Sequence, residues 1–472
     1  MRSSPVCWAS LVLLAVLGIA SVSVGQTDET GTGGVVPVTA GSAHAQGTKG
    51  VSLERCIALA EKNYPKILEA KARRAQRVAS VDITKYTPFS EFSVSAGLGL
   101  APTVSGTADY SKATDTSLTR NMGLAWQVGM DGAIPLYTFG KITHGLEAAE
   151  AAMRVSEHEI DKERNDLRLN VRRAYYGVQL ARDARVLIVD AAAQMDEHIA
   201  KLAEAVASGD GDDIQLLRMR VFRADLTVRK SEADKQEAVA LSALRFLTGQ
   251  GHDLDVPDVA LQAETQQLEP MSEYLAMARL YRPELAMARA GVAARRAMVK
   301  VETSKMFPDL GLALSAKWSY APEVTDQTNP FVRDSGNYLY YGLGLVARYK
   351  LDFVPQAARV SQAKSQLDEV MATEQWASSG IAQQVTDAYA EVRDTHTKLA
   401  ALSEAAKLAK QWLVKVQQGI EVGTMDEQDI VDPAKEFALK RFAEMMAMYD
   451  YNVAVSRLAQ ATGSERVLSH GR

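Results

Sequence analysis

The residues whose chemistry is easiest to interpret are charged side chains that follow two glycine-containing turns. Gly423 is followed by Asp429 and Asp432, six and nine residues later. The turn at Gly209 has Arg218 nine residues later instead. An acidic residue at the start of a helix is stabilised by the helix dipole, so these aspartates alone do not predict a binding site. Their role depends on where the surrounding elements place them.

The other reactive side chains form no catalytic or metal-binding pattern. Histidines are scattered, no carboxylate pair or Ser/His arrangement recurs, and no Cys/His group has metal-ligand spacing. The sequence also lacks a G-x-x-x-x-G-K-[ST] loop, which would bind nucleotide phosphates. We therefore expect no enzymatic activity, no cofactor and no bound metal, and transport would need an external energy source.

The composition predicts a folded protein that does not bind nucleic acid. The chain has 472 residues, of which 47% are hydrophobic and 24% are charged, so it has enough apolar surface to fold. The formal net charge is -5, from 53 Lys and Arg against 58 Asp and Glu, and gives no general attraction to phosphate polymers.

The first residues resemble a secretory signal. Arg2, an apolar run from Leu11 to Ala20 and small residues up to Gly25 predict a signal peptide over residues 1–25, followed by a flexible leader over 26–50. An uncleaved anchor is the alternative, but the apolar run is short of the ~20 residues that span a bilayer. No run of 18 apolar residues occurs after it, so any membrane crossing would use strands.

The chain contains an internal duplication. Landmarks of different kinds align at offsets of 214 to 220 residues: Pro65 with Pro283, Pro88 with Pro308, Tyr175 with Tyr389, Gly209 with Gly423, and Thr248 with Thr462. We expect a first repeat over residues 51–250, a linker over 251–270, a second repeat over 271–463 and a tail over 464–472.

Each repeat is expected to contain a helix, two strands, a very long helix and a return helix. Proline-free stretches rich in helix formers predict long helices over 140–208 and 356–422, each about 100 Å long at 1.5 Å per residue. The first return helix is expected over 213–248. A helix of this length with an apolar stripe needs antiparallel partners, and a plain coiled-coil scaffold is one way to supply them.

Four segments alternate apolar and small or polar residues, at about 91–100, 122–136, 309–320 and 339–352. A period of two predicts strands with one apolar face. A half-buried soluble sheet shows the same alternation, but hairpins between very long helices favour a transmembrane β-barrel. Four strands cannot close a barrel. Two copies would give eight strands and a filled lumen, whereas three would give twelve and room for a channel.

These features together resemble the TolC family of outer-membrane efflux and secretion channels, over residues 51–463. The most specific motif is GTMDEQDIVD from Gly423 to Asp432, which is similar to the family's second periplasmic hairpin. The resemblance implies that Asp429 and Asp432 line a periplasmic gate, where carboxylate rings favour cations. The first hairpin departs from the pattern. There we expect Arg218 to be a possible gate partner, and Gly209 and Gly423 to mark hairpin ends that dock an adaptor.

The resemblance implies a mainly α-helical fold with a transmembrane β portion, in which a trimeric 12-stranded β-barrel continues into an α-helical barrel. It also implies a passive outer-membrane channel of a tripartite efflux pump or type I secretion system, with its helical tunnel in the periplasm. The expected partners are two further copies, a periplasmic adaptor (membrane fusion protein), an inner-membrane transporter and outer-membrane lipid. A periplasmic coiled-coil scaffold or adaptor is the alternative. The exported substrate, whether drug, metal ion or protein, is not encoded in a readable motif.

Overall fold

The computed structural model describes residues 50–469, except 90, 103, 106–114, 117–121, 210, 266, 267, 325, 327–333, 335 and 426. The chain divides into two units, Met1–Gly47 and Thr48–Arg472, and only the second contains described residues. The predicted signal peptide and nearly all of the predicted leader therefore lie outside the described residues.

The predicted order of helix, two strands, long helix and return helix is present twice. The first repeat contains α2 (Leu53–Asn63), α3 (Pro65–Tyr86), β1 (Phe92–Pro102), β4 (Met122–Tyr137), α4 (Lys141–Ser208) and α5 (Asp213–Thr248). The second contains α6 (Met271–Tyr281), α7 (Pro283–Ser304), β5 (Asp309–Tyr320), β6 (Tyr338–Arg348), α8 (Phe353–Glu421) and α9 (Val431–Thr462). Shorter elements are η1 (Thr87–Phe89), β2 (Val104–Ser105), β3 (Asp115–Thr116), η2 (Glu427–Ile430) and α10 (Arg466–Ser469).

Local sequence determines where the helices begin and end. Pro65 and Pro283 each occupy the first position of a helix, where a missing amide hydrogen costs nothing, and the residues before them are extended. Gly209 ends α4 with φ of 88°, a left-handed conformation that glycine adopts without strain. After the first turn, no proline and no left-handed glycine interrupts the 68 residues of α4 or the 69 residues of α8.

The two hairpins join into one antiparallel sheet with the order β1-β4-β5-β6. The central pair is β4 with β5, which brings Trp126 of the first repeat to Trp318 of the second, with ring centroids 4.5 Å apart. β1 and β6 form the two edges of this sheet.

Strand β6 is shorter than the alternation at 339–352 predicts. It ends at Arg348, which pairs with Asp309, the first residue of β5. The residue before Asp309 is Pro308, which has no amide hydrogen to continue the ladder. The apolar alternation therefore continues to residue 352, beyond the last residue of β6 that pairs with β5.

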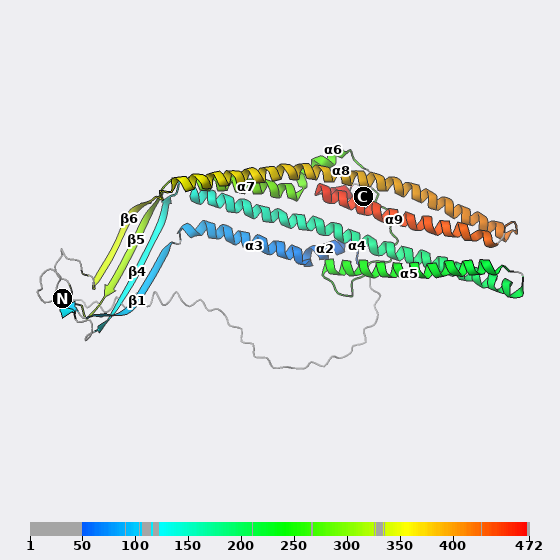
Figure 1. Cartoon of the computed structure of the whole chain (residues 1–472), viewed down its shortest axis with the longest axis horizontal. Helices are drawn as coiled ribbons and strands as arrows, with labels where there is room; N and C mark the ends of the chain where they lie inside the picture. Colours follow the sequence, from blue (N-terminus) through cyan, green and yellow to red (C-terminus); the bar gives the residue numbers. More distant parts are fainter. Residues whose placement is uncertain are drawn as a thin grey trace. The chain divides into compact units, whose positions relative to one another are not determined.

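The helices form a layer in which long and short helices alternate. Short helices α3 and α5 lie on one side of α4, α7 and α9 lie on its other side, and α8 follows them (Figure 1). The sheet lies at one end of this layer and the two helical hairpins reach the other end (Figure 1).

The two hydrophobic cores repeat the duplication in three dimensions. Val171 and Leu244 are fully buried in the core of the first repeat. Val385 and Leu458, each 214 residues later, are fully buried in the core of the second. Each core packs a long helix against the return helix of its own repeat, so the duplicated positions perform the same structural task.

Candidate functional site

One face of the sheet is apolar and exposed to an unusual degree. Leu98 is 73% exposed and Leu345 is 81% exposed, and their neighbours at every second position are also apolar. Soluble proteins rarely expose a contiguous apolar patch of this kind, and a lipid-facing strand surface has this composition.

The opposite face of the sheet carries small and charged residues. Gly97 and Gly344 have open space where a side chain would begin, since an added Cβ would meet no atom within 4 Å. Lys317 of β5 approaches Asp131 of β4, with Nζ and Oδ2 3.5 Å apart. A face of small residues with a matched ion pair fits a water-filled lumen.

The second helical hairpin reverses direction through a tight turn at Gly423. The backbone of Gly423 has φ of 75°, and the Thr424 amide and hydroxyl both donate to the Gly419 carbonyl, at 2.8 and 3.0 Å. Ile430 packs with Leu413 and Val416 of α8, which fixes the start of α9 against the end of α8. These contacts hold the start of α9 beside the end of α8, where the acidic residues follow.

Both predicted gate aspartates are exposed near this turn. Asp429 lies in the 3₁₀ turn η2, and Asp432 lies in the first turn of α9. The positive end of the helix dipole favours a carboxylate at both positions. The structure establishes that both carboxylates are exposed next to the turn that ends the hairpin. Their role as a gate stays a prediction.

The first helical hairpin ends in a different way. The Asp212 carboxylate caps α5 by accepting a hydrogen bond from the Ile214 amide at 2.9 Å. Arg218 is exposed on α5. Its pairing with Asp429 or Asp432 stays a prediction.

The structure also contains a charged cluster that the sequence did not reveal. Arg182 of α4 donates to Glu237 of α5 at 2.7 Å, to the Val256 carbonyl at 2.6 Å and to Asp255 at 2.5 Å. Burial lowers the pKa of Arg182, but these acceptors outweigh it and the net pKa is raised. Arg185 adds a second bond to Glu237 at 2.7 Å. The cluster attaches the linker between the repeats to the helical hairpin formed by α4 and α5.

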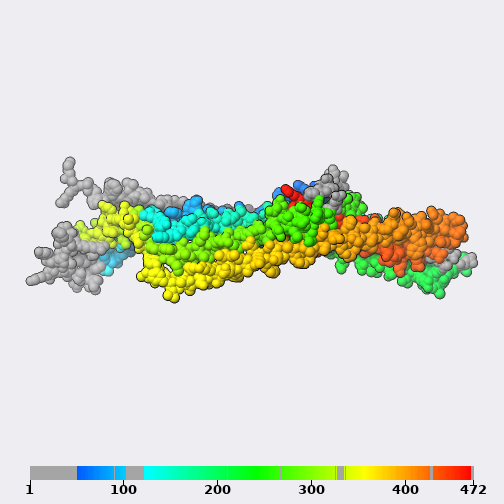
Figure 2. All heavy atoms as spheres, turned by 90° about the horizontal axis from the view of Figure 1, so that it is seen from above, coloured from blue at the N-terminus to red at the C-terminus, as the bar shows by residue number. Residues whose placement is uncertain are grey.

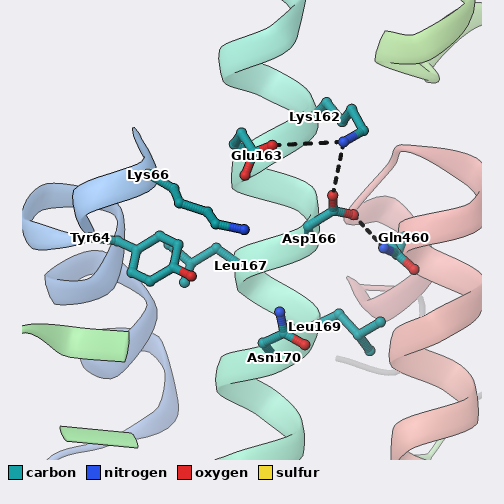
Figure 3. A pocket seen from close by; sticks show the side chains of 9 residues that line it. All are labelled: Tyr64, Lys66, Lys162, Glu163, Asp166, Leu167, Leu169, Asn170 and Gln460. Atoms are coloured by element: carbon teal, nitrogen blue, oxygen red, sulfur yellow. Dashed lines mark hydrogen bonds and ion pairs between the residues drawn. The ribbon is translucent and has the colours of Figure 1, made fainter. Parts of the chain in front are cut away.

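A polar pocket lies where the two repeats meet at the level of the α2–α3 break (Figure 3). Its volume is about 300 Å³, and Tyr64, Lys66, Lys162 and Asp166 are among its lining residues. The Lys162 Nζ atom lies 3.5 Å from Oδ2 of Asp166. The Asp166 Oδ1 atom accepts a hydrogen bond from Gln460 Nε2 of α9 at 2.6 Å. The contact between Asp166 and Gln460 therefore joins the first repeat to the second.

Two basic residues in the middle of α3 pair with protein carboxylates. Arg73 donates to Glu159 at 2.8 Å and Arg74 donates to Glu157 at 2.7 Å, both across to α4. These two arginines therefore connect α3 to the long helix α4.

A family model described as outer membrane efflux protein matches residues 56–250 and 274–464, which covers both repeats. The chain belongs to the outer membrane efflux protein family. A curated relative is the cobalt-zinc-cadmium resistance protein CzcC of Cupriavidus metallidurans, which is 27% identical over 185 residues. The matched part spans 39% of this chain and 44% of the length of that relative.

Solved structures of outer membrane channels share the fold. The open state of MtrE from Neisseria gonorrhoeae superposes with a TM-score of 0.72 at 18% identity, over 87% of this chain and 89% of that one. CmeC from Campylobacter jejuni gives 0.70 at 16% identity, over 87% and 85%. CusC gives 0.73 at 14% identity, over 88% and 93%. The predicted fold class is confirmed, and membership of the family assigns the chain to the outer membrane.

None of the described helices contains a stretch long and apolar enough to span a bilayer.

Proposed function

We propose that the protein is the outer-membrane exit duct of a tripartite efflux pump and conducts its cargo passively. The observation that carries this proposal is the four-stranded sheet with one exposed apolar face and two unpaired edges, β1 and β6. In lipid, each unpaired backbone group costs several kcal/mol, so the edges must be paired by further copies. Three copies give twelve strands and a lumen wide enough for a channel. A periplasmic scaffold would not require a sheet with an exposed apolar face.

The test of the duct is conductance by the purified protein. The full chain, extracted from outer membranes with detergent, should have the mass of a trimer and should form stable channels in planar lipid bilayers. A protein that is released without detergent as a monomer and that adds no conductance would contradict the proposal and favour a scaffold.

We also propose that Asp429 and Asp432 form two carboxylate rings at the periplasmic mouth when three copies assemble. Their exposure beside the hydrogen-bonded Gly423 turn supports this role. Arg218 occupies the position on α5 that Asp432 occupies on α9, 214 residues later, so arginines and aspartates would alternate around the mouth. Such an arrangement holds the mouth closed by ion pairs between copies.

The gate is tested by ion selectivity. Asp429→Asn with Asp432→Asn should lower the preference for cations, measured as the reversal potential in a KCl gradient, because the carboxylate rings attract cations. Asp225→Asn is the matched control, since Asp225 is exposed on α5 but lies away from the turn. Arg218→Glu should raise conductance by opening the mouth. An unchanged reversal potential in the double variant, or unchanged conductance for Arg218→Glu, would contradict the respective assignment.

The hairpin ends around Gly209 and Gly423 are proposed to dock a periplasmic adaptor, which connects the duct to an inner-membrane transporter. The relative CzcC is a cobalt-zinc-cadmium resistance protein, which supports divalent transition-metal cations as the first cargo class to test, and the exposed Asp429 and Asp432 suit cations. Cells that lack the gene should be sensitised to cobalt, zinc or cadmium salts and rescued by the intact chain. Sensitisation to organic drugs alone would assign a different cargo.

A further inference from the structure

An acidic residue just beyond the end of β5 continues the register of the sheet. β5 ends at Tyr320, which pairs with Trp126 of β4. Glu323 lies three residues after Tyr320. Gly123 lies three residues before Trp126, so the same antiparallel register places it opposite Glu323. Gly123 shares a face with Asp131, eight residues later on β4, because residues an even number of positions apart point to the same side. Glu323 therefore belongs to the face of small and charged residues.

The side chain of Glu323 occupies the space that Gly123 leaves by having no Cβ atom. A Cβ atom built at Gly123 would lie 2.1 Å from Cγ of Glu323 and 2.5 Å from its Cβ, which is closer than such atoms approach in proteins. Gly123 is buried, whereas its neighbours Met122 and Leu124 on the apolar face are 51% and 54% exposed. The stem of Glu323 therefore covers the small-residue face, and Glu323 itself remains exposed to solvent.

A hydrogen-bonded turn holds Glu323 in this position. Pro322 is the second residue of the turn from Ala321 to Val324, a position that its fixed φ favours. The Val324 amide donates to the Ala321 carbonyl at 3.0 Å. The Asn337 side chain accepts a hydrogen bond from the Ala321 amide at 2.6 Å and donates to the Val324 carbonyl at 3.0 Å. Since Asn337 directly precedes β6, the turn is attached to the second strand of its own hairpin.

This turn lies at the end of the sheet that is remote from the helices. β4 begins at Met122, beside the turn, and reaches α4 only after Tyr137. Figures 1 and 2 both show the sheet at one end of the protomer and the helical hairpins at the other. In the proposed duct the helical hairpins extend into the periplasm, so Glu323 lies at the mouth that opens to the exterior.

Lys317, on the same face of the sheet, does not neutralise Glu323. The Cγ atom of Lys317 would lie 3.7 Å from a Cβ atom built at Gly129. Glu323 lies over Gly123, six residues earlier on β4, which separates the two positions by about 20 Å at about 3.4 Å per residue. Lys317 instead approaches Asp131, with Nζ and Oδ2 3.5 Å apart. The charge of Lys317 is therefore balanced locally, away from Glu323.

We propose that Glu323 is a selectivity residue at the outer mouth of the duct. Three copies place three Glu323 carboxylates on the lumen surface, where they attract cations and disfavour anions, as rings of acidic side chains do in cation channels. This inference rests on the proposed function and deepens it, since it gives the exit of the duct a preference for cationic cargo.

The placement of Glu323 over β4 is tested by a disulfide within one chain. Gly123→Cys with Glu323→Cys should form a disulfide in the assembled full chain, detected by mass spectrometry of the digested protein, because the two Cβ positions are adjacent. The matched control is Leu124→Cys with Glu323→Cys, since Leu124 is the next residue on β4 but points to the apolar face. This control pair should stay reduced. The native Cys56 is fully buried and does not compete.

The selectivity role is tested by changing the charge at one position in the conducting trimer. Glu323→Cys should shift the reversal potential in a KCl gradient toward zero, because it removes the carboxylates. A sulfonatoethyl methanethiosulfonate reagent returns a negative charge to the thiol and should restore the original potential. A trimethylammonioethyl reagent adds a positive charge and should shift the potential further in the same direction as the substitution. Leu98→Cys is the control on the apolar face and should show none of these shifts.

Salt concentration separates an electrostatic effect from a steric one. The Debye length is about 30 Å at about 0.01 M salt and about 3 Å at about 1 M, so the effect of Glu323→Cys on selectivity should be large at the lower concentration and small at the higher one. The variants keep Asp429 and Asp432, so any contribution of these aspartates is the same throughout the comparison. An effect of equal size at both concentrations would contradict the electrostatic role.

The outcomes separate this inference from the proposed function. A disulfide in the Gly123 pair alone, with a reversal potential that follows the charge at position 323, supports the inference. A conducting trimer in which the Gly123 pair stays reduced, or whose reversal potential ignores that charge, overturns the inference and leaves the duct intact. A protein that does not conduct at all overturns both.

Discussion

Replacing Arg182 with methionine should release the linker between the repeats. The Arg182 side chain is 12% exposed and supplies the donors for Glu237, Asp255 and the Val256 carbonyl. Removing one member of a buried ion pair costs about 3–5 kcal/mol, because the remaining charge is left without compensation. Since Glu237 keeps its bond to Arg185, we expect the lower end, about 3 kcal/mol.

Hydrogen exchange measured by mass spectrometry is the appropriate assay, because it reports local opening of the linker. The Leu261 amide donates to Asp183 at 2.8 Å and is protected while the linker is attached. A loss of about 3 kcal/mol corresponds to exchange that is roughly a hundredfold faster.

Arg185→Met is the matched control for this measurement. The Arg185 side chain is 41% exposed and makes one bond to a glutamate that Arg182 also holds. An exposed pair of this kind contributes about 1 kcal/mol or less, so exchange should accelerate by no more than about fivefold. Equal acceleration in the two variants would refute the reasoning, because the linker contacts of Arg182 would then contribute nothing.

Three further predictions concern the lipid face and two buried groups. Leu345→Arg should lower the amount of assembled protein in outer membranes, since a cation on the lipid face costs about 2–4 kcal/mol, whereas Gly344→Arg on the opposite face should assemble. Burial raises the pKa of Cys56 to about 11, so a thiol reagent at pH 8 should react no faster than the protein unfolds. The unfolded thiol ionises near pH 9.0, so this group lowers stability only as the pH rises from there toward 11. Burial also raises the pKa of Asp183, more than the hydrogen bond from the Leu261 amide lowers it. Asp183→Asn keeps an acceptor and should therefore raise the unfolding temperature at pH 7 but not at pH 3, where both forms are neutral; a rise of equal size at both pH values would contradict this.

Much of the fold was predictable because its signals are local. A proline at position 65 or 283 lacks an amide hydrogen whatever the rest of the chain does. Gly209 adopts a left-handed conformation because it has no Cβ atom. The alternation along each strand is equally local, because successive side chains point to opposite faces. The helix lengths, the strands and the duplication could therefore be predicted from these signals.

The candidate site was predictable only in part. The exposed positions of Asp429 and Asp432 follow from the turn at Gly423, but their function depends on copies that one chain does not contain. The Arg182 cluster could not be predicted, since its acceptors lie 52 to 74 residues away along the chain and nothing in the local sequence distinguishes this arginine from others. The early end of β6 was missed because it depends on Pro308, the residue opposite the next position.

The sequence by itself determined the elements, their lengths and the apolar face of each strand, since those properties depend on residues within a few positions of one another. Only the tertiary structure decided that the two strand hairpins join through β4 and β5, that α4 lies between two pairs of short helices, and that Phe246 is left exposed on α5. These arrangements depend on contacts between segments that are distant in the chain, and the backbone groups and apolar surfaces that remain without partners become visible only once those contacts are made.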